Sequence, residues 1–148
     1  MATVDVSFTP LPAHVRTARL VATAVARRGG VPDSLLDEVR LAVGEACSRA
    51  VEAHQRHCPE VPVHIRLTRD DDRFEVTVTD ASSPEADVPV APASASNGGF
   101  AVDGQLPESV GLAVIAGLAD DVHITRTDEG LAIQMSWNCQ TPADTVSR

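Results

Sequence analysis

Residues 39 to 51 read VRLAVGEACSRAV, and the apolar side chains in this run recur at the three- and four-residue spacing of an α-helix. The spacing extends on both sides, so the sequence predicts one long helix from about Asp33 to about His54. Glu45 and Arg49 stand four residues apart within it and therefore share one face of the helix. Both side chains are expected to point toward the same pocket.

The rest of the chain shows two kinds of periodicity, alternation that predicts strands and helical spacing that predicts further helices. The predicted strands are residues 4–8, 61–67, 74–80, 122–126 and 131–137, and the further helices are residues 13–28 and 109–118. This order lacks the regular strand–helix alternation of a Rossmann fold. It predicts the α+β class, in the form of a two-layer α/β sandwich with a mainly antiparallel sheet and helices on one face.

A length of 148 residues is that of one domain, and all the predicted elements fall within residues 1–137. Residues 81–105 are rich in Pro, Ala, Ser and Gly and are too many for a tight connection, so they are predicted to form a lid loop. Residues 138–148 are polar and are predicted to be a flexible tail.

Composition argues against several classes of function. A net charge of −9 argues against direct binding of nucleic acid, because phosphate contacts need a basic face. An acidic surface suits a basic protein partner, or serves solubility alone. The chain contains no Lys, which excludes a P-loop lysine. No apolar run approaches the length of a membrane span. The three cysteines form no CxxC pair and the chain shows no signal peptide, which together predict a cytoplasmic location.

Three segments, residues 39–51, 76–80 and 110–120, resemble in this order the anti-sigma-factor serine kinases. These kinases belong to the GHKL ATPase superfamily, together with gyrase and the histidine kinases. The resemblance implies a Bergerat-type, histidine-kinase-like ATPase fold with ATP and Mg²⁺ as cofactors. It also implies three partners: a sigma factor, an anti-anti-sigma factor whose serine is phosphorylated, and a second copy of the chain in a homodimer.

In that family the long helix carries the motif E-x-x-x-N, in which Glu is the general base and Asn holds Mg²⁺. Glu45 stands at the Glu position, so the resemblance implies the role of general base for it, whereas Arg49 stands at the Asn position. An Arg cannot ligate a cation, because it has no lone pair to offer and carries its own positive charge. An ordinary surface ion pair between Glu45 and Arg49, worth about 0.3–0.5 kcal/mol, is favoured over catalysis.

Two further family motifs have counterparts here. Asp80 ends a predicted strand at the position of the Asp that receives the adenine amino group, with Ser82 in place of the motif's Gly; a strand-ending acid that begins a turn is the alternative. Gly111 stands at the second Gly of G-x-G-L, a motif that opens a helix and cradles phosphates with backbone amides, and Ser109 replaces the first Gly. Glu108 favours the helix dipole there but repels phosphate.

His54, His57 and Cys58 stand together after the long helix, which makes a metal site one interpretation. Solvated residues at a helix end are favoured, because no further ligands are evident nearby in the sequence.

The resulting functional prediction is an anti-sigma-factor-like regulatory protein that binds a sigma factor, an anti-anti-sigma antagonist, or both, with its nucleotide chemistry reduced or lost. The alternative is an active ATP-dependent serine/threonine kinase that phosphorylates an anti-anti-sigma factor. A third interpretation is a scaffold that binds the antagonist and no sigma factor. Partner surfaces carry no motif, so the sequence does not separate binding of a sigma factor from the scaffold interpretation.

Overall fold

The computed structural model describes residues 2–81, 106–127 and 130–139, without the side chains of residues 106–110 and 127. Its elements in chain order are β1 (Ala2–Phe8), α1 (Pro12–Arg28), α2 (Asp33–His57), β2 (Val63–Arg69), β3 (Arg73–Asp80), α3 (Leu106–Leu118), β4 (Asp121–Thr127) and β5 (Gly130–Asn138). Of the predicted lid and tail, residues 82–105 and 140–148 lie outside the described residues. No helix in the described ranges is long and apolar enough to cross a membrane.

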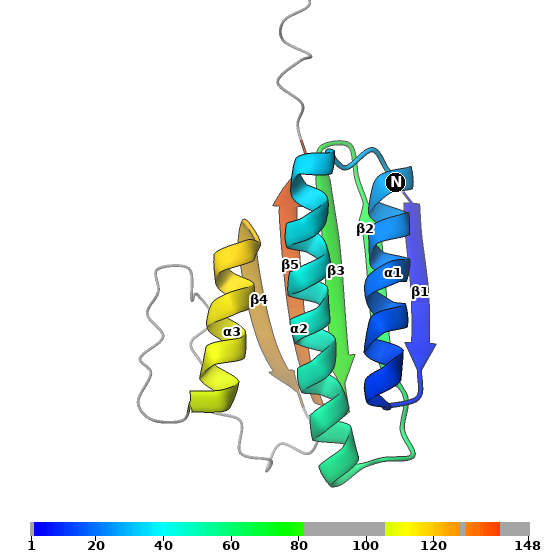
Figure 1. The fold of residues 1–148 in the computed structure, drawn as a ribbon, viewed down its shortest axis with the longest axis vertical. Coiled ribbons are helices and arrows are strands. Elements are labelled where there is room, and N and C mark those ends of the chain that lie inside the picture. Colours follow the sequence, from blue (N-terminus) through cyan, green and yellow to red (C-terminus); the bar gives the residue numbers. More distant parts are fainter. Residues whose placement is uncertain (1, 82–105, 128–129, 140–148) are drawn as a thin grey trace, which may run out of the picture.

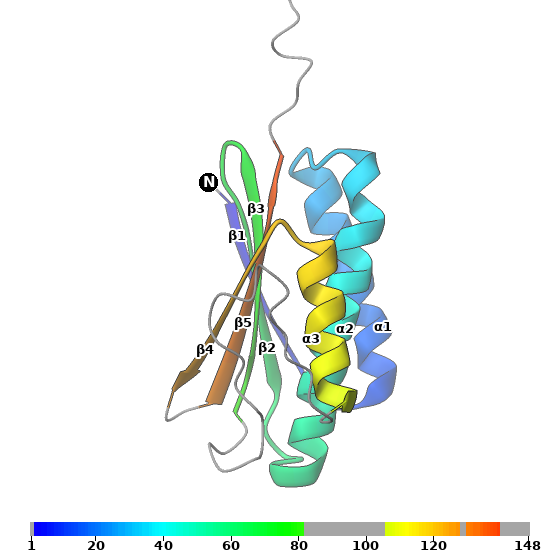
Figure 2. The ribbon, with the colours of Figure 1, turned by 90° about the vertical axis from the view of Figure 1, so that its left-hand side faces the viewer.

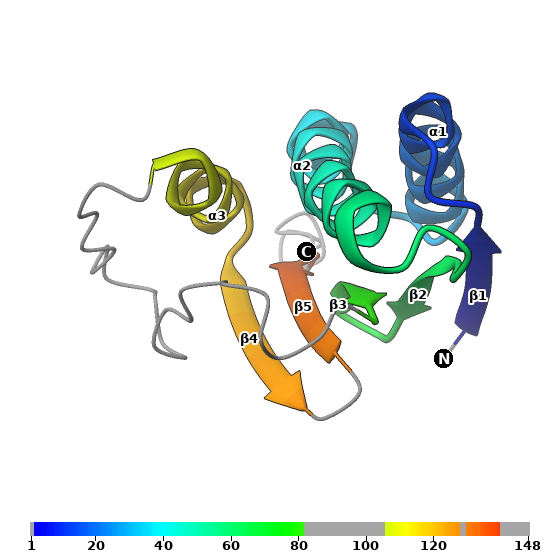
Figure 3. The same ribbon diagram turned by 90° about the horizontal axis from the view of Figure 1, so that it is seen from below.

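The five strands form one antiparallel sheet in the order β1-β2-β3-β5-β4. The three helices lie over one face of this sheet (Figure 1), and the view in Figure 2 separates a helix layer from a sheet layer. Seen from below in Figure 3, α2 lies between α1 and α3. The predicted α+β fold, a two-layer sandwich with helices on one face of an antiparallel sheet, is confirmed.

Two predicted boundaries are displaced for reasons that involve proline. The strand predicted at residues 61–67 begins at Val63, because Pro62 has no N–H to donate to a strand ladder. The helix predicted to begin at Ser109 begins at Leu106 instead. Pro107 is then the second helical residue, a place in the first turn where its fixed φ and missing N–H are tolerated.

The core lies between the sheet and the helices. In β2 the alternation is plain, with Val63, Ile65 and Leu67 all buried. Trp137, the one Trp in the chain, is fully buried on β5 and donates its Nε1–H to the backbone oxygen of Leu118 at 2.9 Å. That bond satisfies the polar edge of the indole and ties β5 to the end of α3.

The central helix, α2, packs closely against α1. A Cβ added at Gly44 would lie 2.6 Å from Cδ of Arg19, so the glycine leaves room for the arginine of the neighbouring helix. Burial raises the pKa of the adjacent Cys47 thiol to about 12, against an opposite effect of the Arg19 charge. Cys47 is therefore a neutral thiol within the core at physiological pH.

The face of the sheet away from the helices is polar. Its clearest contact joins β1 to β2, where Arg66 Nε donates to Asp5 Oδ1 at 2.8 Å. The two side chains are 64% and 62% exposed, so this ion pair lies in water.

Candidate functional site

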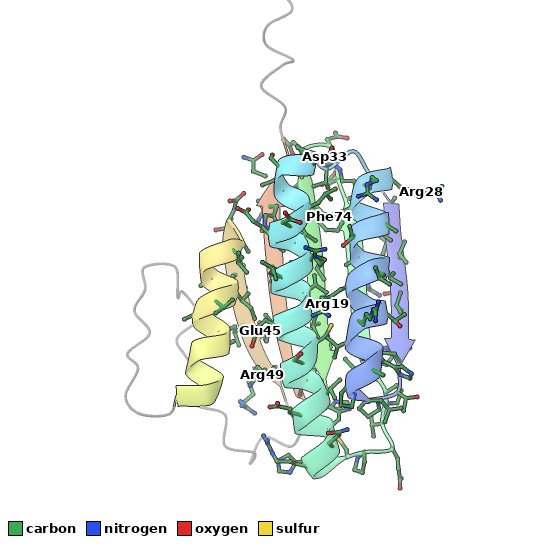
Figure 4. All side chains as sticks on the ribbon, viewed as in Figure 1. Arg19, Arg28, Asp33, Glu45, Arg49 and Phe74 are labelled. Carbon is green, nitrogen blue, oxygen red and sulfur yellow. The ribbon has the colours of Figure 1, made fainter. Side chains whose placement is uncertain are left out.

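The four residues singled out from the sequence lie on α2, the end of β3 and α3. Glu45 and Arg49 stand one turn apart on α2, and Figure 4 shows both on the side of α2 that faces α3. Asp80 is the last residue of β3, and Gly111 lies within α3. The structure joins these residues through two contacts, Arg49 with Asp80 and Glu45 with Gly111.

Arg49 and Asp80 form a buried ion pair. Nη1 of Arg49 lies 3.6 Å from Oδ2 of Asp80, and the two side chains are 8% and 3% exposed. The interpretation of Arg49 as part of a surface pair with Glu45 is therefore wrong, because the guanidinium is buried and is paired with the end of β3. The interpretation of Asp80 as an ordinary turn-starting acid is also wrong, since its carboxylate lies inside the protein and faces a cation.

His54 fixes the backbone immediately after Asp80. Its Nε2 accepts the N–H of Ala81 at 2.8 Å, and its Nδ1 lies 2.7 Å from the backbone oxygen of Val61. Both contacts are met only by the neutral ring with its proton on Nδ1, which donates to Val61. The ring is fully buried, so the favoured interpretation of His54 as a solvated helix-end residue is wrong. This bridge could not be predicted from the sequence, because both of its partners are backbone atoms.

Cys58, just beyond α2, touches the same point. Its Sγ lies 3.9 Å from the backbone oxygen of Ala81, and burial raises the pKa of the thiol, with a further contribution from the negative charge of Asp80. His57, which stands beside it in the sequence, is exposed. Among the residues that the structure describes, no group of three or more His, Cys, Asp or Glu side chains is arranged to hold a metal ion.

Gly130, the first residue of β5, makes a close backbone approach to the end of β3. Its φ is +148°, and a Cβ there would lie 1.8 Å from the backbone oxygen of Asp80. Any side chain would thus force the end of β3 to move. A glycine inside a strand is the sequence signal that points to such an approach.

Glu45 lies against α3 at Gly111. A Cβ added to Gly111 would be 2.9 Å from Oε2 of Glu45, and the Glu45 side chain is half-buried. Gly111 thus leaves space in which the carboxylate packs on the neighbouring helix.

The displaced start of α3 changes the meaning of Gly111. Since α3 begins at Leu106, Gly111 is its sixth residue. Only the first four amides of a helix lack partners within it, so the Gly111 amide is engaged in the helix ladder. The expectation that Gly111 stands in the opening turn of a helix is wrong.

Comparison with known proteins identifies the family. Residues 8–137 match the family described as histidine kinase-like ATPase domain. The chain belongs to that family. This match and the relatives below confirm the resemblance drawn from residues 39–51, 76–80 and 110–120.

Relatives of this histidine kinase-like ATPase domain include a kinase and two solved structures. The serine-protein kinase RsbW of Bacillus licheniformis is 26% identical over 130 residues, which are 84% of this chain and 78% of that protein. The structure of the RsbU and RsbW domains of Rv1364c from Mycobacterium tuberculosis matches with a TM-score of 0.69 and 14% identity over 96% of this chain, which spans only 34% of that larger chain. The mycobacterial sensor histidine kinase MprB matches with a TM-score of 0.56 and 16% identity, over 93% of this chain and 97% of that one. Both structural matches show the shared fold.

The structure gives each residue to which the resemblance assigned a nucleotide role in this histidine kinase-like ATPase domain a definite setting. Arg49 carries a positive charge and has no oxygen atom in its side chain, whereas hard cations take oxygen ligands. The Asp80 carboxylate already faces that guanidinium. The Gly111 amide lies inside α3 rather than at its open end. Glu45 is the one motif residue whose chemical type and partial exposure match the role implied for it.

Proposed function

We propose that this chain is an anti-sigma-factor-like regulatory protein that acts by binding a sigma factor, an anti-anti-sigma antagonist, or both. In this proposal its own nucleotide chemistry is reduced or lost. The observation that carries it is the buried Arg49–Asp80 ion pair in a domain related to the serine-protein kinase RsbW. The pair joins two residues at positions on which binding of ATP and Mg²⁺ would depend, while the fold itself is kept.

In this proposal the fold and its ability to bind a partner are kept, while the phosphoryl-transfer chemistry is reduced or lost. Phosphoryl transfer depends almost entirely on positioning and on the metal ions that neutralise charge in the transition state. Protein recognition depends instead on surface shape and on a few buried contacts, so it survives the loss of a cation site. We further propose that the protein acts in the cytoplasm, as its cysteine content predicts, and as a homodimer, as the family resemblance implies.

The competing function is that of a working ATP-dependent serine/threonine kinase. The observation that favours it is the half-buried carboxylate of Glu45, which is retained at the general-base position and packs on Gly111. In that case Glu45 would accept the proton of the substrate serine, and a group other than Arg49 would have to hold the metal.

One set of measurements tests the proposal against this competitor. Purified protein is titrated by calorimetry with each sigma factor and each anti-anti-sigma protein of its own organism, with and without Mg-ATP, and transfer of γ-phosphate to the antagonist is followed in parallel. We expect at least one partner to bind with a Kd below about 10 µM, equivalent to about −7 kcal/mol, without phosphorylation. Absence of binding to both classes would overturn the proposal. Phosphorylation of the antagonist that disappears in Glu45→Gln, while partner binding is kept, would establish the kinase instead.

A further inference from the structure

Side chains from α2 and from Cys58 just beyond it hold the point at which the chain leaves β3. Arg49 reaches the carboxylate of Asp80, His54 accepts the N–H of Ala81, and Cys58 lies against the oxygen of Ala81. His54 follows Arg49 by five residues, about 7.5 Å along the helix axis, so the contacts span more than one turn. The exit of β3 is thus attached to the central helix by the protein's own side chains.

The ion pair is the charged element of this attachment. Burying a carboxylate that is 3% exposed is costly without a cation or several donors around it, because burial removes the water that would stabilise it. Here the cation is Arg49, which projects from a helix fixed on one side by the Gly44–Arg19 contact and on the other by the Glu45–Gly111 contact. The guanidinium is therefore held in place by packed elements.

We propose that Arg49 is an internal substitute for the nucleotide and its cation. The carboxylate to which the family resemblance assigns the adenine amino group is occupied by the protein's own positive charge, contributed from the position assigned to the magnesium ligand. The exit of β3 is consequently set in one arrangement whether or not nucleotide is present. It follows that partner binding by this chain is independent of nucleotide, an inference that rests on the proposed function.

The first test uses hydrogen–deuterium exchange at the end of β3, which needs no partner. The variant Arg49→Asn removes the internal cation, and Arg40→Asn is the matched control, since Arg40 lies on the same helix in an exposed pair with Asp37. We expect exchange of the amides at residues 78–81 to rise by at least about tenfold in Arg49→Asn and to change by less than about twofold in Arg40→Asn. Addition of Mg-ATP should leave exchange in the wild type unchanged. Equal exchange in the two variants, or added protection of the wild type by Mg-ATP, would overturn the inference.

A second variant keeps the test decisive if Arg49→Asn fails to fold. The double variant Arg49→Asn with Asp80→Asn removes both charges together, so neither is left buried alone. We expect it to fold and to melt at a higher temperature than Asp80→Asn alone. A double variant that melts at a lower temperature than Asp80→Asn alone would show that Arg49 stabilises the fold independently of Asp80 and would contradict the inference.

The partner arm distinguishes failure of this inference from failure of the proposed function. Affinity of the wild type for its partner is measured with Mg-ATP, with Mg-ADP and without nucleotide, and we expect the three values to agree within about twofold. A change of about tenfold or more would overturn the internal substitute while leaving the proposed function intact. Loss of all partner binding would instead remove the proposed function, and the exchange results would still decide whether Arg49 holds the exit of β3.

Discussion

Two arginine–aspartate pairs in this protein have opposite settings. Arg66 and Asp5 lie on the open face of the sheet at 2.8 Å, and both are more than 60% exposed. Arg49 and Asp80 lie at the longer distance of 3.6 Å, and both are less than 10% exposed. Judged by distance alone, the surface pair is the stronger of the two.

Burial reverses that ranking when the compared quantity is the stability lost on removal of one partner. In water the attraction of an exposed pair is screened, and holding two mobile side chains together offsets most of it. In the interior the attraction is larger, but so is the cost of taking both charges out of water, so the intact pair adds little to the free energy of unfolding. Removal of one partner is nevertheless strongly destabilising, because the other charge is then left buried. The importance of a buried ion pair therefore lies in the free energy of unfolding lost when one partner is removed, and the distance between the partners does not measure it.

The largest expected effect comes from breaking the buried pair on one side. Asp80→Ala leaves the Arg49 guanidinium buried without that carboxylate, and we expect the free energy of unfolding to fall by about 3–5 kcal/mol. Chemical denaturation at pH 7 measures the loss. The matched control is Asp5→Ala, the same substitution in the exposed pair, which should cost far less because Arg66 is already solvated.

Equal losses in Asp80→Ala and Asp5→Ala would remove the distinction between the two pairs. Replacement of both buried partners, as in Arg49→Met with Asp80→Leu, should recover most of the loss, because side chains of similar volume then fill the space without charge. A double variant that is less stable than Asp80→Ala would show that the ion pair stabilises the fold in its own right.

His54 provides the next largest effect and extends the comparison to a neutral group. His54→Ala would remove the hydrogen bonds to the Ala81 N–H and the Val61 oxygen, and at about 0.5–1.5 kcal/mol for each bond we expect a loss of about 1–3 kcal/mol. The control is His57→Ala, three residues further along and exposed, where we expect no measurable change in the denaturation midpoint. A loss at His57 as large as that at His54 would mean that helix-end charge, rather than the buried bridge, is responsible.

The long helix and the layered fold were predictable from the sequence because their signals are periodic. Apolar spacing in residues 33–54 and alternation in the strands depend only on which side of each element faces the core. Boundaries were less well predicted where one residue type overrides the pattern, as Pro62 does at the start of β2 and Pro107 does in the first turn of α3.

The site was only partly predictable, because its decisive contacts join residues far apart in the chain. Helical spacing correctly placed Glu45 and Arg49 on one face of α2 but suggested that they pair with each other at the surface. Arg49 pairs with Asp80, which lies 31 positions away in the sequence, and no local sequence pattern predicts such a pair. His54 was misjudged for a related reason, since its partners are backbone atoms that carry no residue identity.

Glu45 falls between the two pairs in exposure, and Gly111→Ala tests how firmly it is held. The added Cβ would lie 2.9 Å from Oε2 at the flexible end of the Glu45 side chain, which turns away at small cost. Alanine also favours a helix over glycine by about 0.5–1 kcal/mol, so we expect the free energy of unfolding to change by less than about 1 kcal/mol. Thermal unfolding measures it, and a loss of several kcal/mol would show that the carboxylate is locked in place as firmly as Asp80.

The smallest expected effect is at Asp5, where pH provides the test. The hydrogen bond from Arg66 holds the pKa of the Asp5 carboxyl below its ordinary value of 3.8. A lowered pKa in the folded state means that the contribution of Asp5 to stability is complete above that ordinary value and is lost as pH falls through the folded pKa. We therefore expect Asp5→Asn to be slightly less stable than the wild type at pH 7, with the two curves of stability against pH converging as pH falls below the folded pKa of Asp5.

The same exposed pair should respond to salt. Because Asp5 and Arg66 stand in water, raising the ionic strength to about 1 M, where the Debye length is about 3 Å, should shrink the difference between Asp5→Asn and the wild type at pH 7. The loss caused by Asp80→Ala should change little under the same conditions, since ions do not reach side chains that are less than 10% exposed. If salt reduced both losses in equal proportion, Arg49 and Asp80 would be solvated, and neither the contrast between the two pairs nor the role proposed for Arg49 would stand.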